Sequence, residues 1–213
     1  LLENGYEVRA MVLPNEDVSS LFDLDLDLKL GNVLDPLSLQ RVFKGVDYVF
    51  PMAGIVSIMP GEEDLVWKVN VEGTRNVLKA AADANIKRLV YTSSIHAFSR
   101  EWQGVIDEQV PFDPENPVGV YDRTKAVATL AVKQAIKEGM DAVIVCPTGV
   151  VGPYDYRGSS MGELVHDLTQ RRIHMLVEGA YDFVDVRDVA VGHRLALERG
   201  KAGQVYILSG HQI

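Results

Sequence analysis

Cysteine, long apolar runs and positive charge are all scarce in this sequence. A single cysteine, Cys146, among 213 residues excludes an internal disulfide framework and a zinc site built on cysteines. The longest uncharged stretch, residues 48–61, holds two prolines and two glycines, so it is too short and too broken to cross a bilayer. The five histidines show no metal-ligand spacing, and no metal site is predicted.

Acidic residues outnumber basic ones, with 30 Asp and Glu against 21 Lys and Arg, and the formal charge is −9. This balance argues against nucleic acid or a membrane surface as a partner. We expect a protein without a signal peptide, located in the cytoplasm. Residues 1–5 have the pattern of a helix end, and residues 204–209 form a strand pattern that stops at once. We therefore expect flanking segments on both sides.

Strand patterns alternate with helical patterns along the whole chain. Strands are expected at residues 6–13, 22–30, 46–52, 86–92, 141–146 and 204–209. Helices are expected at residues 36–44, 64–85, 121–138, 162–172 and 187–199. The alternation predicts an α/β protein with a doubly wound, Rossmann-type parallel sheet. In such a sheet, ligands bind at the carboxyl ends of the strands.

The first candidate site residues are Tyr121 and Lys125, which lie on one face of a predicted helix. An ammonium beside a phenol favours the phenolate and suits an acid–base tyrosine. Taken alone, the pair fits a solvated helix face equally well. Ser94 ends a predicted buried strand, where its hydroxyl either binds a ligand or caps a turn. Ser94 and Tyr121 are far enough apart in the chain to meet at one carbonyl oxygen.

Three further features are weaker. Asn70 lies on the sheet-facing side of a long apolar helix, where a buried amide needs hydrogen-bond partners. Ala53 and Gly54 follow one strand, and Pro147 to Val150 follow another, where small residues allow a ligand close to the backbone. Each of these three features can be explained either by a bound ligand or by ordinary packing in which all hydrogen bonds are made within the protein.

Six segments occur together in one order and spacing: residues 46–54 (VDYVFPMAG), 70–80 (NVEGTRNVLKA), 89–94 (LVYTSS), 121–125 (YDRTK), 147–153 (PTGVVGP) and 183–190 (FVDVRDVA). In this combination the sequence resembles extended short-chain dehydrogenases/reductases of the NAD-dependent epimerase/dehydratase family. Within that family it is most similar to dihydroflavonol-reductase-like proteins. The resemblance runs along nearly the whole chain.

The resemblance implies a catalytic role for three residues. Tyr121 would be the acid–base, Lys125 would lower its pKa and bind the nicotinamide ribose, and Ser94 would orient the substrate oxygen. The cofactor, NAD or NADP, would contact Tyr121 and Lys125 as well as seven other residues. Those residues are Asn32 and Val33 at the adenine, Ala53, Gly54 and Asn70 along the cofactor, and Pro147 and Val150 at the nicotinamide.

The sequence also departs from the family pattern. It contains no Gly-x-x-Gly-x-x-Gly, so we expect a sheet without the first strand and its pyrophosphate-binding turn. Thr124 stands where the family usually has Ser, and residues 12–15 do not decide between NAD and NADP. Residues 95–99 lack the epimerase and dehydratase motifs, which favours reduction of a ketone or aldehyde. A sugar-nucleotide epimerase or dehydratase and a non-catalytic dinucleotide sensor stay open as alternatives.

We expect a dinucleotide-binding domain at residues 1–150. Residues 151–213 would form part of a substrate-binding region, mixed with the last sheet elements. The loop at residues 99–119 would bound the substrate site, and His96 is either a loop histidine or part of that pocket. Apolar side chains also lie outside the faces of helices 64–85 and 121–138 that are expected to pack on the sheet, which suggests a homodimer through these two helices. They include Leu65, Trp67, Leu78 and Ala81 on the first helix and Leu130 on the second.

Overall fold

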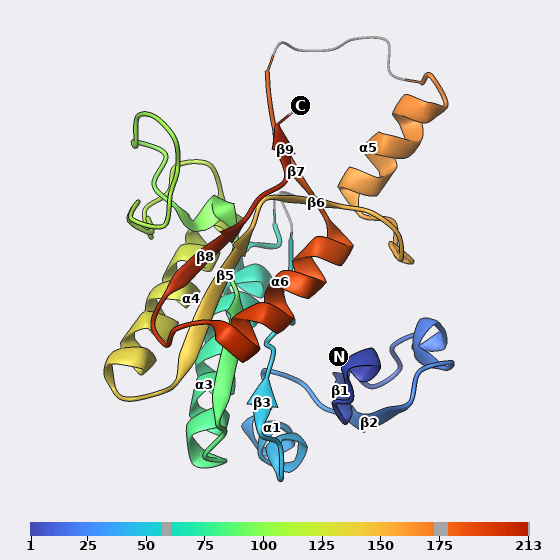
Figure 1. Ribbon diagram of the computed structural model, residues 1–213, viewed down its shortest axis with the longest axis vertical. Helices are drawn as coiled ribbons and strands as arrows, with labels where there is room; N and C mark the ends of the chain where they lie inside the picture. The colour runs from blue at the N-terminus through green and yellow to red at the C-terminus, as the bar shows by residue number, and fades with distance from the viewer. Residues whose placement is uncertain (57–60, 173–178, 213) are drawn as a thin grey trace.

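The computed structural model describes residues 1–56, 61–172 and 179–212. Its centre is a four-stranded parallel sheet in the order β3-β4-β5-β8 (Figure 1). These strands are Tyr48–Val49, Arg88–Thr92, Ala142–Pro147 and Val205–Leu208. Strand β5 is buried along its whole length, Cys146 included, because its neighbours and the helices on both faces cover it.

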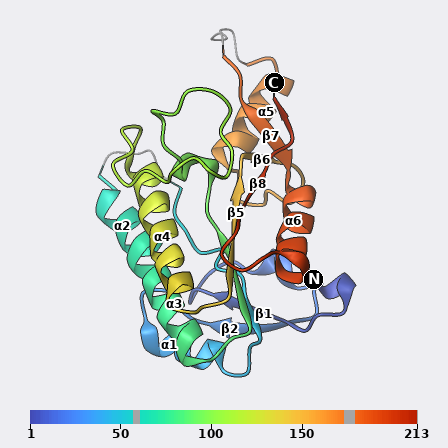
Figure 2. The ribbon, with the colours of Figure 1, turned by 60° about the vertical axis from the view of Figure 1, so that its left-hand side comes forward.

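Helices cover both faces of this sheet, as a doubly wound fold requires (Figure 2). On one face lie α2 (Glu63–Trp67), α3 (Gly73–Asp83) and α4 (Val120–Lys137), and on the other lies α6 (Val186–Arg199). The helix predicted at 64–85 is confirmed, but a π-helical turn, Lys68–Glu72, separates α2 from α3. Such turns are rare and occur often at functional sites. The predicted fold class is therefore confirmed.

A second parallel pair, β1 (Val8–Val12) and β2 (Leu26–Leu30), is not hydrogen-bonded to the central sheet among the described residues. The interruption between β1 and β3 agrees with a sheet that lacks one strand. Helix α1 (Pro36–Phe43) follows, begun by Asp35, whose carboxylate accepts from the Leu37 N–H at 3.0 Å. The short 3₁₀ turns Leu2–Asn4 and Ser19–Leu21 flank β1.

Two strands differ from their predictions, one in its burial and one in its length. Leucines alternate with charged residues over 22–30, which predicts a half-buried strand, but Leu28 and Leu30 of β2 are exposed, and so is Leu24 before it. The strand expected at 46–52 is reduced to Tyr48–Val49. It pairs only with β4, and Pro51 has no N–H to extend the ladder.

A small three-stranded sheet was not expected from the sequence. It consists of β6 (Gly149–Val151), β7 (Asp182–Asp185) and β9 (His211–Gln212), and it lies above the central sheet in Figure 1 together with α5 (Ser160–Thr169). By contrast, α6 and β8 belong to the central layers. The division into a dinucleotide-binding domain and a partial substrate-binding region stays a prediction, and so does its boundary at residue 150.

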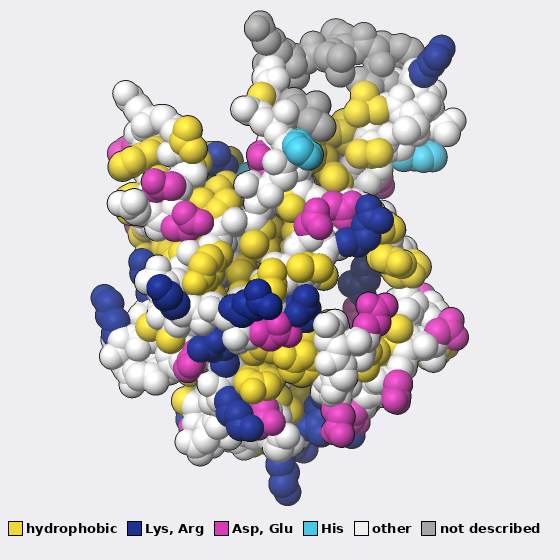
Figure 3. Space-filling model, in the orientation of Figure 1, with side chains coloured by type: hydrophobic (Ala, Val, Ile, Leu, Met, Phe, Trp, Pro, Cys, Tyr) yellow, Lys and Arg dark blue, Asp and Glu magenta, His cyan; other side chains and the backbone are white. Residues whose placement is uncertain are grey.

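The surface carries charges of both signs. On the face in Figure 3, Lys and Arg side chains lie next to Asp and Glu rather than in one basic patch. Within the described residues, no helix combines the length and the apolar character that a bilayer crossing needs.

Candidate active site

The carboxyl ends of β3, β4 and β5 meet at one edge of the central sheet, where the start of α4 faces them. A cavity of about 220 Å³ opens there. Its walls hold six of the predicted site residues: Gly54, Ser94, Tyr121, Lys125, Pro147 and Val150. The other lining residues are Met52, Val56, Thr92, Ser93 and Thr148. The structure thus brings together residues from four separate segments of the chain.

Lys125 reaches into this cavity from the first turns of α4. Its ammonium donates to the carbonyl oxygen of Thr92 at 2.8 Å and lies 5.5 Å from the ring centre of Tyr91. Burial lowers the pKa of Lys125 from 10.5 to about 8, because desolvation disfavours the charged form. The hydrogen bond to the last residue of β4 fixes the ammonium at the strand end.

Tyr121 precedes Lys125 by one helical turn. Burial raises the pKa of Tyr121, and the nearby Ser94 hydroxyl acts in the opposite direction. The expected lowering of this pKa by Lys125 is therefore not found. The reason is that desolvation of the phenol dominates, while the ammonium is directed to the Thr92 carbonyl.

Ser94 starts a single 3₁₀ turn, Ile95–Ala97, where its hydroxyl accepts from the His96 N–H at 3.2 Å. The two readings of Ser94, turn cap and site residue, are thus compatible. One hydroxyl caps the turn and also lines the cavity beside Tyr121. The preceding residue, Ser93, also lines the cavity, and its hydroxyl is hydrogen-bonded to that of Thr129 at 2.6 Å.

Asn70 lies in the π-helical turn and is 3% exposed. Its amide oxygen accepts from the Ile55 N–H at 2.8 Å, and its nitrogen donates to the Ile55 carbonyl at 2.9 Å and to Thr124 at 3.1 Å. The side chain therefore ties the loop after β3 to α4. Thr124 completes the link by donating to the Tyr121 carbonyl at 2.8 Å. Asn70 holds the cavity walls in place, and its predicted contact with the cofactor stays a prediction.

Besides Asn70, three more predicted cofactor residues do not line the cavity. Asn32 and Val33 lie beyond β2. The Asn32 amide oxygen accepts from the Leu34 N–H at 2.8 Å, and Val33 is buried against Gly73. Ala53 is exposed beside Gly54. Their contacts with a cofactor stay predictions.

A larger hollow, of about 470 Å³, lies between the segment that follows β1 and the segment that follows β6. Exposed side chains line it: Asp17, Ser19, Ser20, Asp23, Tyr156 and Arg157. None of the predicted site residues is among them, and we place the candidate active site in the smaller cavity.

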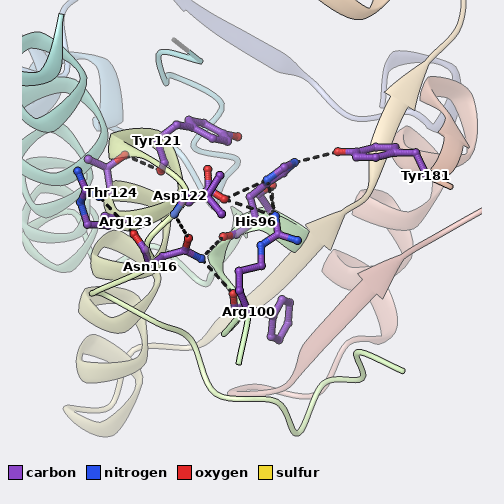
Figure 4. A network of polar contacts seen from close by, with 11 residues as sticks. His96, Arg100, Asn116, Tyr121, Asp122, Arg123, Thr124 and Tyr181 are labelled. Carbon is purple, nitrogen blue, oxygen red and sulfur yellow. Dashed lines mark hydrogen bonds and ion pairs between the residues drawn. The ribbon is translucent and has the colours of Figure 1, made fainter. Parts of the chain in front are cut away.

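Sequence reasoning missed a polar network next to Tyr121. His96 contacts the carboxylate of Asp122 at 3.1 Å and the hydroxyl of Tyr181 at 2.8 Å, and Arg100 lies against both His96 and Asp122 (Figure 4). Two signals were available, because His96 was already considered as part of the pocket and Asp122 directly follows Tyr121. Tyr181 is 85 residues from His96, so no local pattern connects them.

A doubly wound parallel sheet with this tyrosine–lysine helix at its strand ends defines a short-chain dehydrogenase/reductase of the extended type. The model of the NAD dependent epimerase/dehydratase family matches residues 1–209. The chain belongs to that family, and the resemblance found in the sequence is confirmed.

Relatives named as reductases or demethylase components match almost the whole chain. It is 36% identical over 210 residues to sterol demethylase protein B of Methylococcus capsulatus, covering 99% of this chain and 64% of that protein. It is 36% identical to a putative dihydroflavonol 4-reductase of Synechocystis sp., covering 100% of this chain and 63% of that protein. The crystal structure of gox2253 superposes with a TM-score of 0.86 at 35% identity, over 100% of this chain and 65% of that one. The chain thus spans less than two thirds of these relatives.

Proposed function

We propose that the full-length protein is an NAD(P)-dependent oxidoreductase that reduces a ketone or aldehyde. The observation that carries this proposal is the meeting of Ser94, Tyr121 and Lys125 in one cavity at the strand ends. The similarity to a putative dihydroflavonol 4-reductase supports reduction rather than epimerisation.

The residues of the cavity fit the nicotinamide end of a dinucleotide. An ammonium and hydroxyl groups suit a ribose, and the walls at Gly54, Pro147 and Val150 offer small or apolar surfaces to a flat ring. We assign Ala53 and Asn70 to the neighbouring stretch of the cofactor and Asn32 and Val33 to its adenine. When bound, the reduced cofactor supplies a hydride.

In this proposal Tyr121 is the proton donor. Burial raises its pKa, so the phenol keeps its proton near neutral pH and can give it to the carbonyl oxygen of the substrate. The Ser94 hydroxyl holds that oxygen in place. The Lys125 ammonium, fixed by the Thr92 carbonyl, stabilises the phenolate that remains on Tyr121.

The test is an assay of the full-length protein with NADH and NADPH against a panel of ketones and aldehydes. We expect a loss of nicotinamide absorbance that depends on the carbonyl compound. Sugar nucleotides are assayed in parallel by product analysis. Inversion or dehydration of a sugar without net cofactor consumption would replace the reductase by an epimerase or dehydratase. Cofactor binding with no turnover of any kind would indicate a dinucleotide sensor.

We also propose a homodimer through α2–α3 and α4, which lie side by side in Figure 2. Leu65, Trp67 and Leu130 are 50%, 40% and 39% exposed there. Leu78 and Ala81, which were also expected on this surface, are buried in the core instead. A cytoplasmic location stays a prediction, and the single buried Cys146 is compatible with a reducing compartment.

Light scattering of the full-length protein should show a dimer, and Leu130→Glu should yield monomer. A glutamate at the interface would bury an unpaired charge, which costs several kcal/mol. Arg199→Glu, at an exposed position in the last turn of α6 on the opposite face of the sheet, is the control and should leave the dimer intact. A wild-type monomer at all concentrations, or a dimer unaffected by Leu130→Glu, contradicts this interface.

A further inference from the structure

His193 is a buried histidine of α6, the helix that covers the face of the central sheet opposite to α4 (Figure 2). Its side chain has no part in the proposed reaction, although the residue is only 5% exposed and both ring nitrogens have polar partners. Nδ1 lies 2.8 Å from the Val189 carbonyl oxygen, and Nε2 lies 2.9 Å from the Thr92 hydroxyl oxygen. The second contact reaches the last residue of β4, which lines the candidate active site.

The Val189 carbonyl decides which nitrogen of His193 carries the proton. A carbonyl oxygen can only accept a hydrogen bond, so Nδ1 must be protonated and donate to it. Burial lowers the pKa of His193, and the hydrogen bond to Val189 only partly opposes this shift. The imidazole is therefore neutral near pH 7, and Nε2 is an acceptor. The Thr92 hydroxyl is then the donor of the second hydrogen bond.

The Thr92 hydroxyl has one proton and two acceptors within reach. The Nε2 nitrogen of His193 is 2.9 Å away, and the Met52 sulfur is 3.3 Å away. A thioether is the weaker acceptor, and a buried imidazole nitrogen is costly to leave unpaired. The hydroxyl proton is therefore directed to His193, which holds the Thr92 side chain on the α6 side of the sheet.

Thr92 connects this histidine to Lys125 through the strand itself. Side chains alternate between the two faces of a strand, and Val90, two residues before Thr92, packs with Ala196 and Leu197 of α6. The carbonyl oxygen of Thr92 accepts from the Lys125 ammonium of α4 at 2.8 Å. A single residue at the end of β4 is thus held by hydrogen bonds from the helices on both faces of the sheet.

We propose that His193 is a positioning residue for Lys125 and that it acts through Thr92. By accepting the hydrogen bond of the Thr92 hydroxyl, His193 fixes the end of β4 and the carbonyl oxygen that holds the Lys125 ammonium. This inference rests on the proposed function, in which that ammonium binds the cofactor ribose and stabilises the Tyr121 phenolate. It gives α6, which contributes no residue to the cavity walls, a part in aligning the cation.

The test is a double-mutant cycle in the full-length protein with Thr92→Val and His193→Leu. Each variant removes the hydrogen bond between the two side chains and keeps the Thr92 carbonyl. Each should weaken binding of the reduced cofactor, measured by calorimetry, and lower kcat, both by about fivefold. The double variant should lose no more than either single variant, because both substitutions remove one contact. Additive losses, or unchanged affinity and kcat in both single variants, overturn the proposal.

His193→Gln separates positioning from stability. Its amide oxygen can accept from the Thr92 hydroxyl, so this variant should regain most of the cofactor affinity and kcat that His193→Leu loses. It also carries the test if His193→Leu does not fold. A glutamine variant that folds and is as impaired as the leucine variant contradicts the proposal.

Tyr206→Phe is the control. It removes the acceptor of the Lys201 N–H, a hydrogen bond of 3.1 Å, from a residue that packs on the same face of the sheet and does not line the cavity. This variant should lower the free energy of unfolding and leave cofactor affinity and kcat unchanged. A loss of kcat equal to that of His193→Leu would reduce His193 to a structural role and overturn the proposal.

Two measurements test this inference without any turnover. Nitrogen-15 NMR of the His193 ring should show the neutral Nδ1–H form at neutral pH, with an Nε2 signal that shifts in Thr92→Val. The Nε2–H form in the wild type overturns the proposal. If no carbonyl compound is reduced but the cofactor affinities follow the double-mutant cycle, the proposed reaction is contradicted and the positioning role of His193 is supported.

Discussion

Replacement of Tyr121 by Phe should lower kcat of the full-length enzyme by about 10²-fold or more. The phenol proton is what the proposed reduction transfers, and Phe keeps the ring that fills the space beside Ser94 and His96. The Lys125 ammonium stays fixed by the Thr92 carbonyl, so cofactor affinity should change little. The measurement is steady-state turnover from nicotinamide absorbance, with cofactor binding measured by calorimetry.

Tyr48→Phe is the control for this variant. Tyr48 opens β3, at the end of the strand away from the cavity, and its loss of a hydroxyl should leave kcat unchanged. Full activity of Tyr121→Phe would exclude Tyr121 as the proton donor. Equal losses in both variants would mean that the effect comes from general destabilisation rather than from proton transfer.

The sequence predicts best what depends on local patterns. Helix α4 and strand β5 lie within one residue of their predicted ends, because apolar runs, helical spacing and a terminal glycine or proline act over a few residues. The small sheet of β6, β7 and β9 was missed, because Gly149–Val151 and Asp182–Asp185 pair across some thirty residues and are too short to show a period. Long-range pairing of short strands leaves almost no local signal.

In the candidate site, too, local patterns could be predicted from the sequence and long-range effects could not. Six predicted residues line one cavity because each follows the end of a strand or starts a helix, and parallel strands end at one edge. The direction of the Tyr121 pKa shift could not be predicted from its spacing to Lys125. Spacing places two side chains on one face, but burial and the direction of the ammonium decide the electrostatics.

Lys125 should contribute to activity at the expense of stability. Burial lowers its pKa from 10.5 to about 8, which corresponds to about 3 kcal/mol of unfavourable free energy when the charged form is folded. The hydrogen bond to the Thr92 carbonyl returns about 1 kcal/mol. Lys125→Met fills similar space without a charge, so it should raise the free energy of unfolding by about 2 kcal/mol at pH 7.

The gain should depend on pH with a defined sign. Below pH 8 the lysine is charged in both the folded and the unfolded state, and the wild type carries the full penalty. Between pH 8 and 10.5 the unfolded chain binds more protons than the folded one, so wild-type stability rises with pH. The advantage of Lys125→Met should therefore be constant below pH 8 and shrink toward pH 10.5.

The same substitution should lower kcat/KM by about 10²-fold or more, because in the proposed mechanism it removes the cation that stabilises the Tyr121 phenolate and binds the cofactor ribose. Urea unfolding of the cofactor-free protein at several pH values, combined with turnover at pH 7, measures both effects on one variant. Lys137→Met is the control, since Lys137 is exposed in the last turn of the same helix and should change neither quantity by much. A stability gain together with retained activity would remove Lys125 from the catalytic site. Lost activity with a pH-independent loss of stability would instead make Lys125 a structural residue, whose hydrogen bond to β4 outweighs the cost of burying its charge.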